Sequence, residues 1–341
     1  MARPAVFLLL FALVCFVPLC LFIPSFVWKL YPDFYDNSCP KAQEIVRSVV
    51  AKAVARETRM AVSLMRLHFL DCFVQGCDGS VLLDSSGDIV SEKNSNYNRR
   101  SARGFEVIDE IKSALEKECP STVSCADALA LAARDSSVLV STSFFFLTGG
   151  PSWEVPLGRR DSRGASLRSS NDNIPAPNNT FQTILSAFNI HSLDLTDLVA
   201  LSGSHTIGFS RCTSFRQRLF NQSGINGQAS ETLNSSYAAW LRPRCPTRSG
   251  GDQNLFALDF MSASKFDNSY FKNLIKNKGL LNSDQVLFSS NRQARDLVEK
   301  YAEDQDEFFE QFAKSMIKMG NISPLTGFSG EVRKNCRDIN Y

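Results

Sequence analysis

Two polar side chains lie within an otherwise apolar segment, and both need partners if that segment is buried. Residues 63–73 read S-L-M-R-L-H-F-L-D-C-F and carry Arg66 and His68. A guanidinium or an imidazole is costly to bury in apolar surroundings unless it is hydrogen-bonded or paired. The segment therefore predicts either a structural histidine with a salt-bridged arginine, or two residues of a functional site.

The residues that follow are rich in oxygen ligands. Residues 71–80, D-C-F-V-Q-G-C-D-G-S, place carboxylates, a hydroxyl and turn-permitting glycines close together. Calcium takes about six to eight oxygen ligands, some of them backbone carbonyls, and a bond between Cys72 and Cys77 would hold such a loop curled. The loop lacks the spacing of an EF-hand, so a plain surface turn stays open as the alternative.

A third candidate is His205, which follows the apolar segment D-L-V-A-L-S-G-S of residues 197–204. A histidine in this position can bind a metal ion through a ring nitrogen, but a lone histidine is more often a satisfied core residue. The residues alone leave both interpretations open.

Helices are needed to position these residues, and the apolar spacing predicts them. Apolar residues recur at intervals of three and four in residues 42–53, 107–115 and 308–316. No long alternating strand and no βαβ rhythm is visible. We predict an all-α domain with Gly-, Pro- and Asn-rich loops, folded as one unit from about residue 29 onward, with two lobes around a central cleft.

Composition and charge narrow the classes of function. The 341 residues are 44% hydrophobic and 21% charged, which excludes disorder as the main character of the chain. The net charge of +2 comes from basic and acidic residues that are spread along the sequence. Because no basic run could follow a phosphate backbone, nucleic acid is not expected as a partner.

The N-terminus differs from the rest of the chain. Arg3 precedes an apolar stretch from Ala5 to Val27. This predicts a secretory signal over residues 1–28, although a stretch of roughly 20 residues is also long enough to be a retained membrane anchor. Four glycosylation sequons fit export, at Asn178, Asn221, Asn234 and Asn321.

Cysteine usage agrees with an exported protein. Cys15 and Cys20 leave with the signal, and an even set remains: Cys39, Cys72, Cys77, Cys119, Cys125, Cys212, Cys245 and Cys336. In an oxidising compartment such a set predicts disulfides, whose pairing does not follow from the spacing alone.

A series of motifs runs through the chain in a fixed order. They are F-Y-D-N-S-C-P from Phe34, R-L-H-F-L-D-C-F-V-Q-G-C-D-G-S from Arg66, S-A-R-G-F from Ser101, V-S-C-A-D from Val123, G-G-P-S-W-E-V-P-L-G-R-R-D from Gly149, I-P-A-P from Ile174, D-L-V-A-L-S-G-S-H-T-I-G from Asp197 and F-D-N-S-Y-F from Phe266. The series resembles the class III secretory plant peroxidases over the whole mature chain, residues 29–341.

The resemblance implies the plant haem-peroxidase fold, with two helical lobes around a buried b-type haem and four disulfides. His205 would be the axial ligand of the haem iron, and Asp284 would accept its other ring proton, which makes the imidazole a stronger donor. Arg66 would stabilise the transition state, and the carbonyl of Pro175 would accept a hydrogen bond from phenolic substrates.

The resemblance also implies two calcium ions and a disulfide pattern. The first ion would be bound by Asp71, Val74, Gly76, Asp78, Ser80 and, through water, Glu92. The second would be bound by Thr206, Asp259, Ser262 and Asp267. The disulfides would join Cys39 to Cys119, Cys72 to Cys77, Cys125 to Cys336 and Cys212 to Cys245.

The implied function is that of a secreted peroxidase in the apoplast or cell wall. It would reduce hydrogen peroxide and oxidise small phenols, in peroxide removal or in the cross-linking of lignin and other phenolics. We expect a monomer without a stable association with membranes.

One position departs from the family. The distal helix of these peroxidases reads R-L-H-F-H-D-C, and its second histidine, the acid-base catalyst, is Leu70 here. His68 lies about 200° around the helix from Leu70 and matches the structural histidine. Asn98, which orients the missing histidine, would lose its partner. An alternative function is therefore a haem-binding homologue that reacts slowly with peroxide, in which Leu70→His restores the rate.

A second departure is Val140–Leu147, which the family pattern lacks. Its Val-Ser start and Phe-rich end are typical of translated intron sequence, and a surface loop is the alternative. A third functional class, a disulfide-rich interaction module without haem, is disfavoured by the presence of His205, Asp284 and both sets of calcium ligands.

Overall fold

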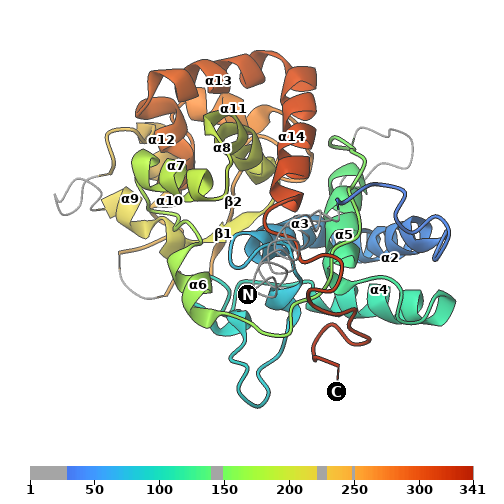
Figure 1. Ribbon diagram of the computed structural model, residues 1–341. Helices are drawn as coiled ribbons and strands as arrows, with labels where there is room; N and C mark the ends of the chain where they lie inside the picture. The colour runs from blue at the N-terminus through green and yellow to red at the C-terminus, as the bar shows by residue number, and fades with distance from the viewer. Residues whose placement is uncertain (1–28, 140–148, 221–228, 248–249, 341) are drawn as a thin grey trace, which may run out of the picture.

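The computed structural model describes residues 29–139, 149–220, 229–247 and 250–340 of the chain (Figure 1). The predicted secretory signal, the segment Val140–Leu147 and the sequon at Asn221 lie outside these residues. Within them, helices are joined by irregular loops, and β1 (Phe209–Arg211) pairs antiparallel with β2 (Leu255–Ala257). The predicted all-α class is confirmed, with this one short ribbon added to it.

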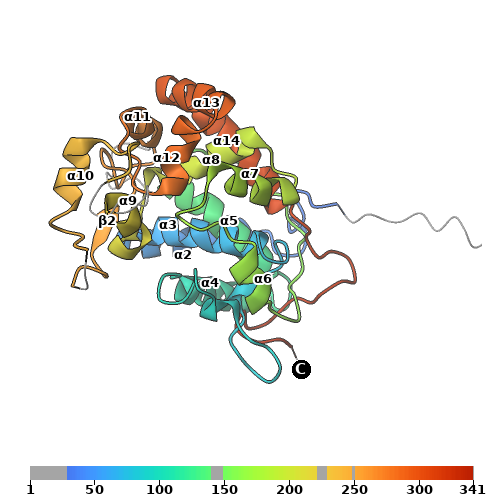
Figure 2. The ribbon, with the colours of Figure 1, turned by 90° about the vertical axis from the view of Figure 1, so that its left-hand side faces the viewer.

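The helices form two lobes, which Figures 1 and 2 show one above the other. The first lobe contains α2 (Ala42–Arg56), α3 (Met60–Cys72), α4 (Phe105–Glu118) and α5 (Cys125–Leu139). The second contains α7 (Phe181–Ile190), α8 (Leu195–Ser202), α11 (Ser269–Ile275), α12 (Asn282–Ser289), α13 (Arg292–Glu303) and α14 (Gln305–Gly320). The shorter α6 (Leu167–Asp172), α9 (Arg216–Phe220) and α10 (Ser235–Leu241) lie in the connections. Because α14 packs against both α8 and α3, it joins the two lobes.

The predicted helices form because their apolar stripes are buried. On α4, the side chains of Val107, Ile108, Ile111 and Leu115 face the core, as the spacing of three and four predicts. Polar residues mark where other helices begin: the Thr180 side chain accepts from Thr183 N before α7, and Asp304 accepts from Asp306 N and Glu307 N before α14. Such caps satisfy amide groups that have no partner inside the helix.

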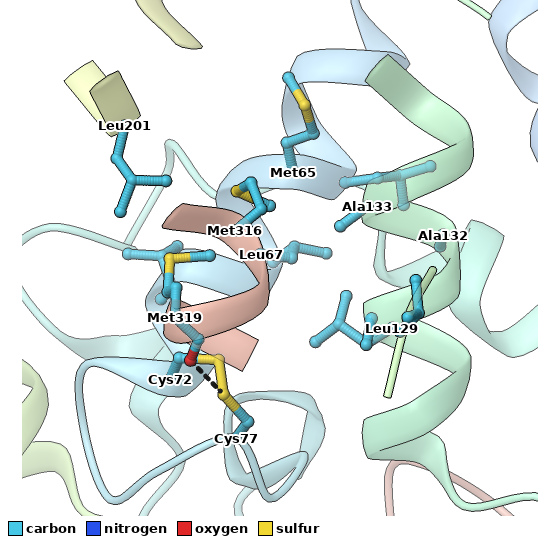
Figure 3. Packing of buried hydrophobic residues seen from close by; sticks show 14 of the residues in the cluster. Met65, Leu67, Cys72, Cys77, Leu129, Ala132, Ala133, Leu201, Met316 and Met319 are labelled. Carbon is cyan, nitrogen blue, oxygen red and sulfur yellow. Dashed lines mark hydrogen bonds between the residues drawn. A yellow bond between two sulfur atoms is a disulfide. The ribbon is translucent and has the colours of Figure 1, made fainter. Parts of the chain in front are cut away.

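The centre of the core lies where α3, α5, α14 and α8 meet (Figure 3). Met65 and Leu67 of α3 pack near Leu129, Ala132 and Ala133 of α5. Met316 and Met319 of α14 and Leu201 of α8 close the other side. Small alanines on α5 let its backbone approach α3 closely, so the position of α3 is fixed by dense packing on several sides.

Four disulfides hold the loops to this core. They join Cys39 to Cys119, Cys72 to Cys77, Cys125 to Cys336 and Cys212 to Cys245, which are the pairs that the resemblance implies. The Cys125–Cys336 bond spans 211 residues and ties the C-terminal segment to the start of α5.

None of the described helices is long and apolar enough to cross a membrane by itself. Only Phe181–Ile190 and Leu195–Thr206 pass the length and composition test as a pair, and the two are bent by 108°.

Candidate functional site

His205 lies directly after α8, in the short 3-10 helix Gly203–Thr206. Its Nδ1 is 2.7 Å from Asp284 Oδ1, and its side chain keeps 34% of its surface exposed. Because the carboxylate accepts a hydrogen bond, Nδ1 carries the ring proton and Nε2 keeps a free lone pair. An imidazole oriented in this way is ready to bind a metal ion.

Asp284 is held in place by its own helix and by a tyrosine. It is the third residue of α12, and its Oδ2 accepts from Leu281 N at 3.1 Å. The Tyr270 hydroxyl donates to Oδ1 at 3.2 Å. The positive end of the helix dipole favours a carboxylate in this first turn. Asp284 therefore cannot turn away from His205 without losing these hydrogen bonds.

The segment after His205 lies against the start of α3. The guanidinium of Arg59 lies 5.5 Å from the centre of the Phe209 ring, and a Cβ added at Gly208 would come within 3.0 Å of Val62. Gly208 also has a φ of +107°, a backbone conformation that disfavours other residues. The two histidine-bearing segments that the sequence singled out thus belong to one region of the fold.

Arg66 and Leu70 lie one turn apart on α3. Arg66 Nη2 donates to Tyr97 O at 2.8 Å and to Ser101 Oγ at 3.1 Å. Burial and the charge of Arg211 lower the pKa of Arg66 to about 10, so the guanidinium stays protonated at neutral pH. Leu70 is buried, with 1% of its surface exposed. This face of α3 offers hydrogen-bond donors from Arg66 but no proton acceptor at position 70.

His68 faces the core rather than this site. Its Nδ1 lies 3.6 Å from Cys72 Sγ, and its imidazole lies next to Gly320 at the end of α14. Burial and the charge of Arg159 lower the pKa of His68 to about 3. The imidazole is therefore neutral, and its surroundings fit the structural role expected for it.

Asn98 and Pro175 lie in two loops. The Nδ2 of Asn98 donates to Glu92 O at 3.0 Å and to Ser170 Oγ at 3.3 Å. Its Oδ1 is buried and has no hydrogen-bond partner. Pro175 is partly exposed between α6 and α7, and Ser283 N donates to the neighbouring Pro177 O, which joins this loop to the start of α12.

The oxygen-rich loop after α3 is buried and tightly curled. Asp71 accepts from Gly79 N at 2.9 Å and from Val81 N at 3.3 Å, and Asp78 accepts from Ser80 N at 3.0 Å. Gly76 has a φ of +126°, and a Cβ there would meet Ser323 O at 2.4 Å. Only glycine fits that position.

Charge is unbalanced in this loop. Burial and the charge of Asp78 raise the pKa of Asp71, and burial raises the pKa of Glu92 to about 7. Ser80 Oγ and Glu92 Oε2 are buried without hydrogen-bond partners. A cluster of carboxylates with unused oxygen atoms is what a hard cation such as Ca²⁺ would stabilise.

A second group of oxygen atoms surrounds Thr206, the residue after His205. The Thr206 hydroxyl lies 3.3 Å from Asp259 Oδ2 and 3.4 Å from Asp267 Oδ1, and Ser262 Oγ lies 2.9 Å from Asp267 Oδ1. Burial and the charge of Asp267 raise the pKa of Asp259. The structure thus brings together the four residues named for the second calcium ion.

The family model described as Peroxidase matches residues 46–304. The chain belongs to the peroxidase family. It is 74% identical over 340 residues to Peroxidase 49 of Arabidopsis thaliana, covering 100% of both chains. It is also 77% identical over 312 residues to Peroxidase 15 of Arabidopsis thaliana, covering 92% of this chain and 89% of the relative. Peroxidase 72 of Arabidopsis thaliana is 67% identical over 332 residues, with 97% and 96% covered.

These relatives confirm the class III plant peroxidase assignment, the fold and the peroxidase activity that the sequence motifs imply. Membership of this family also implies a haem cofactor, hydrogen peroxide and an electron donor. The alternative of impaired activity, which was based on Leu70, receives no support from the relatives over the peroxidase function.

Two further residues belong to this region, although the sequence alone assigned neither of them a role. Tyr270 lies within the motif F-D-N-S-Y-F but received no role, although a tyrosine so close to a predicted ligand motif could have been examined as a hydrogen-bond donor to Asp284. Arg211, six residues after His205 in the sequence, donates from Nη2 to Arg100 O and forms no ion pair with a carboxylate among the described residues. A single arginine outside any motif gives no sequence signal of function. Arg211 is recognised as part of this region only because its charge acts on Arg66 in the structure.

Proposed function

We propose that this peroxidase binds haem iron through His205 Nε2 and oxidises small phenols that approach near Pro175. The observation that carries this proposal is the hydrogen bond between His205 and Asp284, which leaves Nε2 free and partly exposed. Arg211 adds support, because a guanidinium without a carboxylate partner can pair with an acidic group of a bound haem.

The chemistry that bound haem supplies is an iron centre at which peroxide is reduced. The chain contributes groups around that centre. Asp284 increases the electron donation of His205 by accepting its ring proton. Arg66 directs N–H groups toward the space beside α3, where they can stabilise negative charge that develops on a departing oxygen. Leu70 neither takes nor gives a proton, and the neutral, buried His68 lies on another face of α3.

We further propose that two Ca²⁺ ions bind the two oxygen clusters. The ligands are Asp71, Val74, Gly76, Asp78, Ser80 and Glu92 for the first, with Glu92 acting through water, and Thr206, Asp259, Ser262 and Asp267 for the second. The unpartnered oxygens of Ser80 and Glu92 support the first site. Because Thr206 follows His205 directly, the second ion would stabilise the segment that carries the iron ligand.

The proposed mature protein comprises residues 29–341, secreted to the apoplast or cell wall after removal of residues 1–28. Its disulfides fit an oxidising compartment. We propose that it acts as a monomer, without a stable membrane association, on hydrogen peroxide and small phenols.

The test uses mature protein folded with haem and calcium. We expect a Soret band that His205→Ala shifts or removes, and peroxide-dependent oxidation of guaiacol that the same variant loses. Glu299→Ala, on the exposed side of α13, is the matched control and leaves both unchanged. A His205→Ala protein with the wild-type Soret band would show that the iron ligand lies elsewhere.

A further inference from the structure

An aromatic cluster reaches the surface at α10. Trp240 has 41% of its surface exposed and Phe260 has 42%, whereas Tyr237 between them is buried. The rings of Tyr237 and Trp240 are stacked, with centroids 6.0 Å apart and an interplanar angle of 15°. Phe260 lies 5.6 Å from Trp240 and 5.0 Å from Tyr237. Stacking of this kind fixes the rings relative to one another.

Two cations lie over the exposed rings. The guanidinium of Arg244 is 4.6 Å from the centroid of Trp240, and Lys278 Nζ is 5.0 Å from the centroid of Phe260. Neither cation forms an ion pair with a carboxylate among the described residues. The surface is therefore both aromatic and positive, a combination that suits aromatic molecules with negative charge.

The cluster continues inward to the region of His205. Tyr237 belongs to a buried apolar group that also contains Leu281, whose amide donates to Asp284 Oδ2. Burial, and after it the charge of Asp284, raises the pKa of Tyr237. Asp284 contacts His205, and the Tyr270 ring lies 6.2 Å from the imidazole. A short chain of packed groups thus leads from exposed Trp240 to the proposed iron ligand.

We propose that Trp240 is a second oxidation site of this peroxidase, at which phenolic polymers too large to reach the haem edge give up single electrons. The inference rests on the proposed binding of haem at His205. Tyr237 passes the electron inward, and Arg244 with Lys278 attracts polymers that carry acidic groups.

The electron balance uses only peroxide and the polymer. Reduction of one H₂O₂ to two waters at the haem requires two electrons and two protons. In each of two turns, Trp240 loses one electron inward through Tyr237 and regains one from a phenol group of the polymer. Each phenol group also releases one proton and becomes a phenoxyl radical, so two phenols are oxidised for each peroxide.

The surroundings of the two rings favour Trp240 as the point of exchange. A tyrosine loses its proton when it is oxidised, and burial, with the charge of Asp284, raises the pKa of Tyr237 and disfavours that loss. A tryptophan can lose an electron while it keeps its proton. The charge of Arg244 makes an oxidised Trp240 less stable, and it therefore takes an electron from a surface donor more readily.

The experiment compares wild type, Trp240→Phe and the control Tyr31→Phe, each as full mature holoprotein with calcium. Tyr31 is 49% exposed and packs on Phe34 instead of the Tyr237 cluster. The donors are guaiacol and a lignosulfonate fraction that is retained by dialysis. We expect Trp240→Phe to lower the rate of lignosulfonate oxidation about tenfold, which corresponds to a rise of about 1.4 kcal/mol in the activation barrier. The rate of guaiacol oxidation should stay unchanged.

A second readout does not depend on turnover. Holoprotein is treated with peroxide without any donor, and oxidised residues are mapped by peptide mass spectrometry. We expect oxidation at Trp240 in wild type and less of it in Tyr237→Phe. Equal lignosulfonate rates for wild type and Trp240→Phe, or unmodified Trp240 in wild type, would overturn the inference. If wild type does not oxidise guaiacol, the proposed haem function itself would be overturned instead.

Discussion

His205 donates its Nδ1 proton to Asp284 across 2.7 Å, and Asp284 is fixed by Leu281 N and by the Tyr270 hydroxyl. The orientation of the proposed iron ligand therefore depends on the first turn of α12. Because Ser283 N of α12 also donates a hydrogen bond to Pro177 O, the same helix turn holds both the proposed ligand and the I-P-A-P loop in place.

We predict that Asp284→Asn weakens electron donation from His205, since an amide accepts a hydrogen bond less strongly than a carboxylate. The expected result is a lower iron–histidine stretching frequency in resonance Raman spectra of the ferrous protein and about 10- to 100-fold slower guaiacol oxidation. Tyr270→Phe removes only one of the supporting hydrogen bonds and should have a smaller effect. An unchanged stretching frequency in Asp284→Asn would show that this carboxylate does not tune the ligand.

Without calcium, the stability of the folded protein should decrease as the pH rises. Burial raises the pKa of Glu92 from its ordinary value of 4.5 to about 7. A carboxyl with a raised pKa in the folded state stabilises the fold while it is protonated, and that stability is lost as the pH rises. In calcium-free protein we therefore expect the Tm to fall between about pH 4.5 and pH 7.

Glu92→Gln is the matched control for this prediction, because the amide keeps the shape and removes the charge. It should flatten the pH dependence of the Tm in calcium-free protein. Added Ca²⁺ should raise the Tm of wild type most near neutral pH, where the carboxylates are ionised. A calcium-free Tm that rises between pH 4.5 and pH 7 would contradict the role assigned to Glu92.

The core between α3 and α5 sets the stability of the first lobe. Leu129 is fully buried at their contact, at 0% exposure (Figure 3). Leu129→Ala should lower the free energy of unfolding by about 2–5 kcal/mol through lost burial and a cavity. Leu255→Ala, at a position that is 43% exposed, should change it far less. Denaturant unfolding of the two variants, with haem and calcium bound, measures the difference.

Much of the fold followed from local patterns. The spacing of three and four in residues 42–53, 107–115 and 308–316 predicted α2, α4 and α14, because a helix buries one stripe. The strands β1 and β2 were not expected, since three residues are too few to show an alternation. Their pairing depends instead on the contact between residues that lie far apart in the chain.

Residues of the candidate site could be predicted from the sequence only where they belong to a recognisable motif or match the family resemblance. His205 and Arg66 stand in such motifs, whereas Asp284 was assigned only by the family resemblance; His205 and Asp284 are in contact in the structure. The contact of Phe260 with Tyr237 and Trp240 could not be predicted, because Phe260 follows β2 whereas the other two residues lie on α10. The sequence could not show that Asn98 Oδ1 has no hydrogen-bond partner either, because this depends on the positions of all its neighbours in the fold.

Leu70 occupies the position at which the family has its acid-base histidine. Leu70 is buried one turn from Arg66 on α3, while Asn98 Oδ1 is buried without a donor. A histidine at position 70 would supply an acid-base group one turn from Arg66 and, as the family resemblance implies, an N–H that Asn98 Oδ1 could accept. We expect Leu70→His to accelerate the reaction with peroxide by about 10²- to 10⁴-fold, the usual contribution of a positioned acid-base group. Stopped-flow absorbance of the Soret band measures this rate.

Phe69→His, which adds the same group on a neighbouring face of α3, should give no acceleration. In the double variant Leu70→His with Asn98→Ala, part of the gain should be lost, since the imidazole is no longer oriented. If wild type already reacts as fast as Leu70→His, another group or a chain of waters moves the proton, and Leu70 is no obstacle to peroxidase activity.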